Sequence, residues 1–143
     1  MRITKIETFL VDCYRTNWVF VKVITDEGIV GVGEATLEGR ELTVAEAIGE
    51  LGRYLIGQDP FAIEKHSMRM QRDCYWRTGP ILSTAISGVE MALWDIKGKA
   101  LGVPVYELLG GLVNARIKVY ANGWFAGART AEEFAEKAAA TVA

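Results

Sequence analysis

The first 37 residues contain three runs rich in β-branched, aromatic and other apolar residues, and this pattern predicts three strands. The first run begins at Ile3, the second covers residues 18–24 and the third begins at Ile29. The residues between the second and third runs, 25–28, are Thr-Asp-Glu-Gly, a composition typical of a tight turn. We therefore expect the second and third strands to form a hairpin.

Two glycines, Gly31 and Gly33, alternate with valine in the third run. A Gly-x-Gly pattern also occurs in phosphate-binding loops, but those loops need a third glycine and a helix directly after it. Neither is present here. Glycine within a strand also marks a close approach by another segment, and this is the interpretation we favour for both positions.

A long helix is predicted for residues 79–102, because small or apolar residues recur at spacings of three and four. Gly79-Pro80 suits a helix start, and Gly102 followed by Pro104 suits its end. Asp95 and Lys99 stand four apart, in the favourable order for an ion pair on the opposite, exposed side. The predicted buried face comprises Ile81, Ala85, Gly88, Val89, Ala92, Leu93, Ile96 and Ala100.

Two shorter helices are predicted before the long one. The first covers residues 43–57 and begins with a capping box formed by Thr43 and Glu46. The second begins at Asp59-Pro60, with aspartate as the N-cap and proline at the first helical position. Three strands followed by three helices indicate an α+β domain, which we expect to span residues 1–112.

The last part of the chain has a different pattern. Residues 116–121 are predicted to form a strand, and Thr130 with Glu133 forms a second capping box that begins a helix running to the chain end. One strand and one helix cannot bury the strand on both faces. We therefore expect residues 113–143 to be the incomplete start of a second domain.

Composition narrows the functional classes. The 143 residues are 50% hydrophobic and carry a formal net charge of −2 with acids and bases interspersed, so neither nucleic acid nor a membrane surface is an expected partner. The charged N-terminus lacks the apolar stretch of a signal peptide. The two cysteines, Cys13 and Cys74, have no metal-ligand spacing, which favours reduced thiols and a cytoplasmic location.

The long helix and its tail resemble a known sequence signature. The match runs without a gap from Ala85 to Gly110, through Ser87-Gly88, Glu90, Ala92, Trp94-Asp95, Gly98-Lys99, Pro104 and Leu108. It resembles the mandelate racemase and muconate lactonising branch of the enolase superfamily. Members of that branch have an N-terminal capping domain, a three-stranded antiparallel meander plus helices. A (β/α)-barrel follows it, and the present chain would contain only the barrel's first β/α unit.

Within this branch, four pieces look most similar to acid-sugar dehydratases: GEATLEGREL, YLIGQDP, CYWRTGPI and VYANGW. Mannonate dehydratases usually have asparagine at the position of Glu38 and histidine at that of Tyr120, so the galactonate or gluconate kind fits better. Such enzymes remove the proton next to a carboxylate and expel the β-hydroxyl as water. A racemase, epimerase or cycloisomerase of the same branch is the first alternative.

The resemblance also implies Mg²⁺, together with an acid and a base, on later barrel strands that have no counterpart in this chain. We therefore assign no catalytic and no metal-binding residue here, and expect the chain alone to be inactive. Glu90 and Asp95 are interpreted as residues that hold the long helix in place. His66, the single histidine, is interpreted as a surface or packing residue, and Trp76 with Arg77 as packing residues.

In this family two capping-domain loops cover the barrel mouth and contact the far end of the substrate. Here they correspond to residues 13–18 and 36–40, both polar interruptions between predicted elements. The end of the first barrel strand is a further candidate. The predicted substrate-binding residues are Tyr14, Arg15, Trp18, Glu38, Arg40, Asn122 and Trp124.

Partners follow from the same resemblance. They are an acid-sugar substrate, the missing barrel domain and further copies in a homo-oligomer. An alternative of a different class is a free-standing domain that binds or assembles with a partner and catalyses nothing. It predicts that the chain ends naturally at Ala143, with a partner covering the last helix.

Overall fold

The computed structural model describes residues 1–13 and 16–142. These residues divide into two compact units, Met1–Gly111 and Leu112–Ala143. No helix in the described part of the chain is both long enough and apolar enough to cross a membrane.

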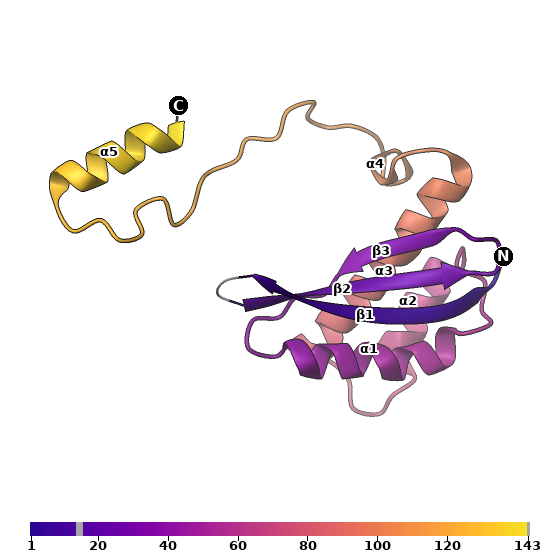
Figure 1. Cartoon of the computed structure of the whole chain (residues 1–143). Helices are drawn as coiled ribbons and strands as arrows, with labels where there is room; N and C mark the ends of the chain where they lie inside the picture. Colours follow the sequence, from indigo (N-terminus) through magenta and orange to yellow (C-terminus); the bar gives the residue numbers. More distant parts are fainter. Residues whose placement is uncertain (14–15, 143) are drawn as a thin grey trace. The chain divides into compact units, whose positions relative to one another are not determined.

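The first unit is built on a three-stranded antiparallel sheet with the strand order β1-β2-β3 (Figure 1). The strands are β1 (Ile3–Cys13), β2 (Thr16–Thr25) and β3 (Val30–Glu34). Gly28, in the turn between β2 and β3, has φ 80°, a value that favours glycine over other residues. The prediction of three strands with a hairpin between the second and third is confirmed.

The first two strands extend further than predicted. Cys13 pairs with Thr16 and Val11 pairs with Trp18, so most of the segment expected to be a loop is strand. Continuous cross-strand pairing satisfies the backbone groups of these residues, which outweighs their polar sequence. The expectation that residues 13–18 form a polar loop is therefore wrong for the residues described. Tyr14 and Arg15 lie outside them.

Three helices cover one face of this sheet (Figure 1). Helices α1 (Glu41–Leu55) and α3 (Pro80–Leu101) pack directly on the strands, and α2 (Ile63–Arg72) packs against α3. A short helix, α4 (Val105–Leu108), follows α3. The centre of the core consists of fully buried aliphatic side chains: Val19, Val21, Val23, Val44, Ile48, Val89, Leu93 and Ile96.

The ends of α3 lie where its sequence predicts. Gly79 precedes the first residue, Pro80, and Gly102 ends the helix in the left-handed conformation with φ 69°. The N–H of Gly102 donates to the carbonyl of Lys99 at 3.2 Å, so a backbone group at the helix end has a partner. Both signals are local, which is why they could be recognised without knowing the fold.

Helix α3 and strand β3 approach each other through glycine. A Cβ atom added at Gly33 would lie 1.9 Å from the carbonyl oxygen of Gly88, and one at Gly31 would lie 2.0 Å from that of Ala92. These separations are far inside van der Waals contact, so only glycine fits at the two strand positions. The prediction that these glycines lie against a close neighbour is confirmed.

Asp95 and Lys99 form the predicted pair, with Nζ and Oδ2 2.7 Å apart, but they do not face away from the domain. Asp95 Oδ2 accepts a hydrogen bond from the N–H of Val32 at 2.8 Å, and Lys99 Nζ donates to the carbonyl of Val30 at 2.7 Å. The pair therefore occupies backbone groups along the outer edge of β3. Because an open edge can pair with another chain, these contacts also protect it.

Glu90 holds α3 to α2, since its Oε2 accepts a hydrogen bond from the Ser67 hydroxyl at 3.0 Å. His66 is buried on α2 and bonds Tyr54 Oη through Nδ1 and the Asp59 carbonyl through Nε2, at 2.8 and 2.7 Å. Because a carbonyl only accepts, Nε2 carries the hydrogen and, in the neutral ring, Nδ1 accepts from the tyrosine hydroxyl. His66 is therefore a packing residue.

The predicted starts of α1 and α2 are wrong. Helix α1 begins two residues early, at Glu41, and has no side-chain cap from Thr43 or any other residue described. Helix α2 begins at Ile63 because Asp59 Oδ1 accepts the N–H of Phe61 at 2.9 Å and forms a turn instead of a cap. For α2, a competing local hydrogen bond therefore displaced the expected helix start.

The second unit contains helix α5 (Ala131–Val142). Its capping box is confirmed, because Glu133 N–H donates to Thr130 Oγ1 at 3.3 Å and Thr130 N–H donates to Glu133 Oε2 at 3.2 Å. The strand expected at 116–121 is not formed in this structure. A strand needs a neighbour for its backbone hydrogen bonds, and no strand in the described residues of this unit supplies one.

Candidate functional site at the start of β2 and the loop before α1

Two predicted substrate-facing segments lie next to each other in the first unit. The N–H of Ala35 donates to the carbonyl of Val19 at 2.8 Å, and the N–H of Val19 donates to Thr36 Oγ1 at 3.1 Å. The loop between β3 and α1 therefore begins beside the start of β2. Trp18 precedes Val19, so the structure brings it to the loop that carries Glu38 and Arg40.

The carboxylate of Glu41 joins these segments. Its Oε1 accepts a hydrogen bond from the Thr16 hydroxyl at the start of β2 and another from the N–H of Gly39, at 3.1 Å, in the loop. Sequence reasoning missed this residue. The available signal was an acid in the first turn of a helix, two residues after a glycine, a position where the helix dipole favours negative charge.

These hydrogen bonds change the acidity of Glu41. The Thr16 hydroxyl is the largest cause, and backbone N–H groups, including those of Gly39 and Asn17, act in the same direction. Together they lower the pKa of Glu41 from its ordinary value of 4.5 to about 2. The carboxylate is therefore negatively charged at any pH near neutrality, and the two segments meet around an anion.

The lowered pKa predicts an acid-sensitive contribution to stability. Because the folded-state pKa lies below the unfolded value, the contribution is complete above about pH 4.5 and is lost as the pH falls toward about 2. We expect Glu41→Gln to lower the urea midpoint relative to wild type at pH 7, and the two midpoints to converge near pH 2. Urea titrations of both proteins across this range measure the difference. If the difference between the two urea midpoints were as large at pH 2 as at pH 7, the prediction would be wrong.

The predicted contact residues are arranged as follows. Trp18 is 44% exposed and meets Phe20 edge to face, with ring centroids 6.0 Å apart. Glu38 and Arg40 are exposed and flank Gly39, which has φ 74°, and Arg40 Nη1 donates to the Gly39 carbonyl at 2.6 Å. An indole, a carboxylate and a guanidinium can contact a polyhydroxylated anion through apolar, accepting and donating groups.

Two further candidates belong to the second unit. Asn122 Oδ1 accepts the N–H of Gly123 at 2.9 Å and so stabilises a turn. Trp124 meets Phe125 and Phe134 edge to face, with ring centroids 5.6 and 6.3 Å apart. Inside this unit both residues have structural partners, and their roles toward a substrate stay predictions.

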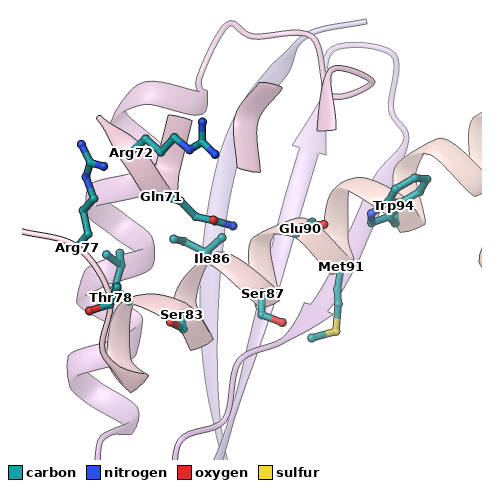
Figure 2. A pocket seen from close by; sticks show the side chains of 11 residues that line it. Gln71, Arg72, Arg77, Thr78, Ser83, Ile86, Ser87, Glu90, Met91 and Trp94 are labelled. Atoms are coloured by element: carbon teal, nitrogen blue, oxygen red, sulfur yellow. The ribbon is translucent and has the colours of Figure 1, made fainter. Parts of the chain in front are cut away.

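A groove of about 590 Å³ lies along α2 and α3 in the first unit. Figure 2 shows Arg72 and Arg77 toward one end and Trp94 toward the other, with Ile86 and Glu90 between them. Sequence reasoning did not find this groove. Trp76, expected to be a packing residue, is 82% exposed, and Arg77 lines the groove, so that interpretation of both is wrong in this structure.

The described residues give no metal site of their own. Within 1–13 and 16–142, no group of three or more His, Cys, Asp or Glu side chains is placed to hold a metal ion. Cys13 is half-buried and Cys74 is exposed, and both are free thiols.

Known proteins are similar to this chain in both sequence and fold. Residues 6–110 match the family described as mandelate racemase / muconate lactonizing enzyme, N-terminal domain. The D-galactonate dehydratase of Pectobacterium atrosepticum is 53% identical over 135 residues, which cover 94% of this chain and 34% of that protein. The chain thus spans about a third of the length of this curated relative.

Two crystal structures extend the comparison. An enolase from Pantoea ananatis, with bound D-gluconate and Mg, is 46% identical with a TM-score of 0.75, over 79% of this chain and 28% of that one. A member of the enolase superfamily from Salmonella Typhimurium is 34% identical with a TM-score of 0.87, over 99% of this chain and 39% of that one. Together with the family match over residues 6–110, they show that this chain belongs to the mandelate racemase and muconate lactonizing enzyme branch of the enolase superfamily.

Proposed function

We propose that this chain is the N-terminal, substrate-capping part of an acid-sugar dehydratase that acts on a galactonate- or gluconate-type aldonic acid. The observation that carries the proposal is the 53% identity to a D-galactonate dehydratase over 94% of the chain. The gluconate bound to the Pantoea ananatis enolase supports the same substrate class. In this proposal residues 1–112 form the capping domain and residues 113–143 begin the barrel.

The proposed reaction is the loss of water from the aldonic acid. A base removes the proton on C2, the carbon next to the carboxylate, and the hydroxyl on C3 leaves as water after protonation. The resulting enol tautomerises to a 2-oxo-3-deoxy acid, so atoms balance without a further reactant. We place the base, the acid and the Mg²⁺ ligands in the remainder of the protein, because the described residues provide no such cluster.

In this proposal, the role of this chain is to cover the substrate. Trp18 supplies an apolar wall, and Glu38 and Arg40 are proposed to bond the hydroxyl groups far from the reacting carbons. Tyr14 and Arg15 are also proposed to contact the substrate, as are Asn122 and Trp124 from the start of the barrel. A cover of this kind excludes water from the reacting carbons and selects the configuration of the substrate.

The test uses the full-length gene product that contains this chain. We would incubate it with Mg²⁺ in D₂O and supply D-galactonate, D-gluconate or D-mannonate in separate reactions, followed by proton NMR. The expected result is a 2-oxo-3-deoxy acid from galactonate or gluconate. Exchange of the C2 proton without loss of water would indicate a racemase or epimerase instead. No change in any acid would favour a binding domain, and the 143-residue chain alone is the matched control.

Assembly and location are part of the same proposal. We infer a closed homo-oligomer in the cytoplasm, which fits the two free thiols. Light scattering of the full-length protein after size-exclusion chromatography measures the assembly, and a monomeric mass would contradict it.

A further inference from the structure

The contacts of Glu41 connect segments that are distant in sequence. Its carboxylate is bonded by Thr16, 25 residues earlier in the chain, and by Gly39 in the loop before α1. Trp18 lies two residues beyond Thr16, and Glu38 and Arg40 flank Gly39. Trp18, Glu38 and Arg40 therefore each lie within two residues of a group that Glu41 binds.

The base of the loop has its own attachment, through the bonds between Val19 and residues Ala35 and Thr36. The bonds of Glu41 act further along the loop, at Gly39. The two bonds of Glu41, from Thr16 and Gly39, are hydrogen bonds to a carboxylate, which are stronger than bonds between neutral groups. The helix dipole explains why an acid is favourable at the start of α1, but it does not explain a bond to the hydroxyl of Thr16 on β2.

We propose that Glu41 is a positioning residue that fixes the Thr16 end of β2 against the loop at 36–40, so that Trp18, Glu38 and Arg40 present one surface to the far end of an acid sugar. This inference rests on the function proposed above. It assigns no contact between Glu41 and the substrate, because the carboxylate is already bonded by Thr16 and Gly39.

Hydrogen exchange of the full-length protein tests the connection itself. Thr16→Val removes the hydroxyl but keeps a β-branched side chain in the strand, Thr16→Ser keeps the hydroxyl, and Glu41→Ala removes the acceptor. The expected result for Thr16→Val is faster exchange in peptides covering 36–42, although the substituted residue lies on β2. Thr16→Ser should exchange like wild type. Glu46→Gln, an exposed acid on the same helix, is the matched control.

Steady-state kinetics tests the consequence for the substrate. A lost hydrogen bond between the segments should raise KM for the aldonic acid about 5- to 10-fold with kcat changed less than about 2-fold, because the reacting groups are untouched. The double variant Thr16→Val/Glu41→Ala should be no worse than Glu41→Ala alone, since both changes break one connection. A general loss of stability would instead lower kcat and the amount of active enzyme.

Three outcomes would overturn the inference. Unchanged exchange at 36–42 in Thr16→Val would show that the hydroxyl does not hold the loop. Faster exchange with an unchanged KM would show that the connection does not position substrate contacts. If the wild-type protein dehydrates no aldonic acid, the proposed function fails and the substrate role of Glu41 fails with it. The exchange result then decides the connection separately, so the two failures are distinguishable.

Discussion

Replacing Gly33 with alanine is expected to cost about 3 kcal/mol or more of folding free energy, because the new side chain forces β3 and α3 apart. The new Cβ atom would lie 1.9 Å from the carbonyl oxygen of Gly88. That oxygen belongs to the backbone of α3 and cannot rotate away as a side chain can. The strand and the helix must therefore separate, and the valines of β2 lose part of their cover.

Urea denaturation of the 143-residue chain, followed by circular dichroism, measures the effect. Gly49→Ala is the matched control, because Gly49 lies within α1 and a Cβ added there meets no atom within 4 Å. Alanine has the higher helix propensity, so this variant should gain up to about 1 kcal/mol. Equal stability of Gly33→Ala and wild type would mean that β3 does not lie this close to α3.

The contact between β3 and α3 also shows how far sequence reasoning reaches. The pattern indicated that Gly31 and Gly33 face a close neighbour, and separately that Gly88 and Ala92 lie on the buried face of the helix. It did not indicate that these two pairs meet. Their meeting depends on strand register and on the angle at which the helix crosses the sheet, and neither is encoded within a short stretch of sequence.

Helix ends were predictable where the signal was local and unopposed. Gly79-Pro80 and Gly102 correctly bound α3, and Thr130 with Glu133 correctly begins α5. Thr43 failed as a cap because the chain already turns at Gly39, so α1 begins earlier. A capping pattern therefore predicts a helix start only when no nearby group competes for the same backbone.

The candidate site was predictable in the same uneven way. The loop at 36–40 was located from its polar composition between two strong elements. Trp18 was placed at the boundary between the first predicted loop and the second predicted strand, and its pairing with Val11 makes it part of β2. Glu41 was missed because its decisive partner, Thr16, is 25 residues away. The strand at 116–121 failed because a strand is defined by a neighbour that these residues do not have here.

Under the proposed function, replacing Arg40 with alanine is expected to lower kcat/KM of the full-length protein for the aldonic acid about 10- to 100-fold. A hydrogen bond to a charged group contributes about 1.5–3 kcal/mol when its partner is removed. Arg40 is exposed in the loop before α1, and its planar guanidinium can bond two oxygens of a substrate at once. The loss should appear mainly in KM, because the bonded oxygens are far from the reacting carbons.

Two comparisons separate this substrate contact from a role in folding. Arg53→Ala removes the same side chain from the other end of α1, where it lies in the last turn, and should change kcat/KM less than about 2-fold. Arg40→Lys keeps the charge but not the planar pair of donors, so it should recover only part of the lost activity. If Arg40→Ala retains wild-type kcat/KM, the loop at 36–40 does not bind substrate through this residue. If lysine restores activity fully, the contact is a simple charge rather than a paired hydrogen bond.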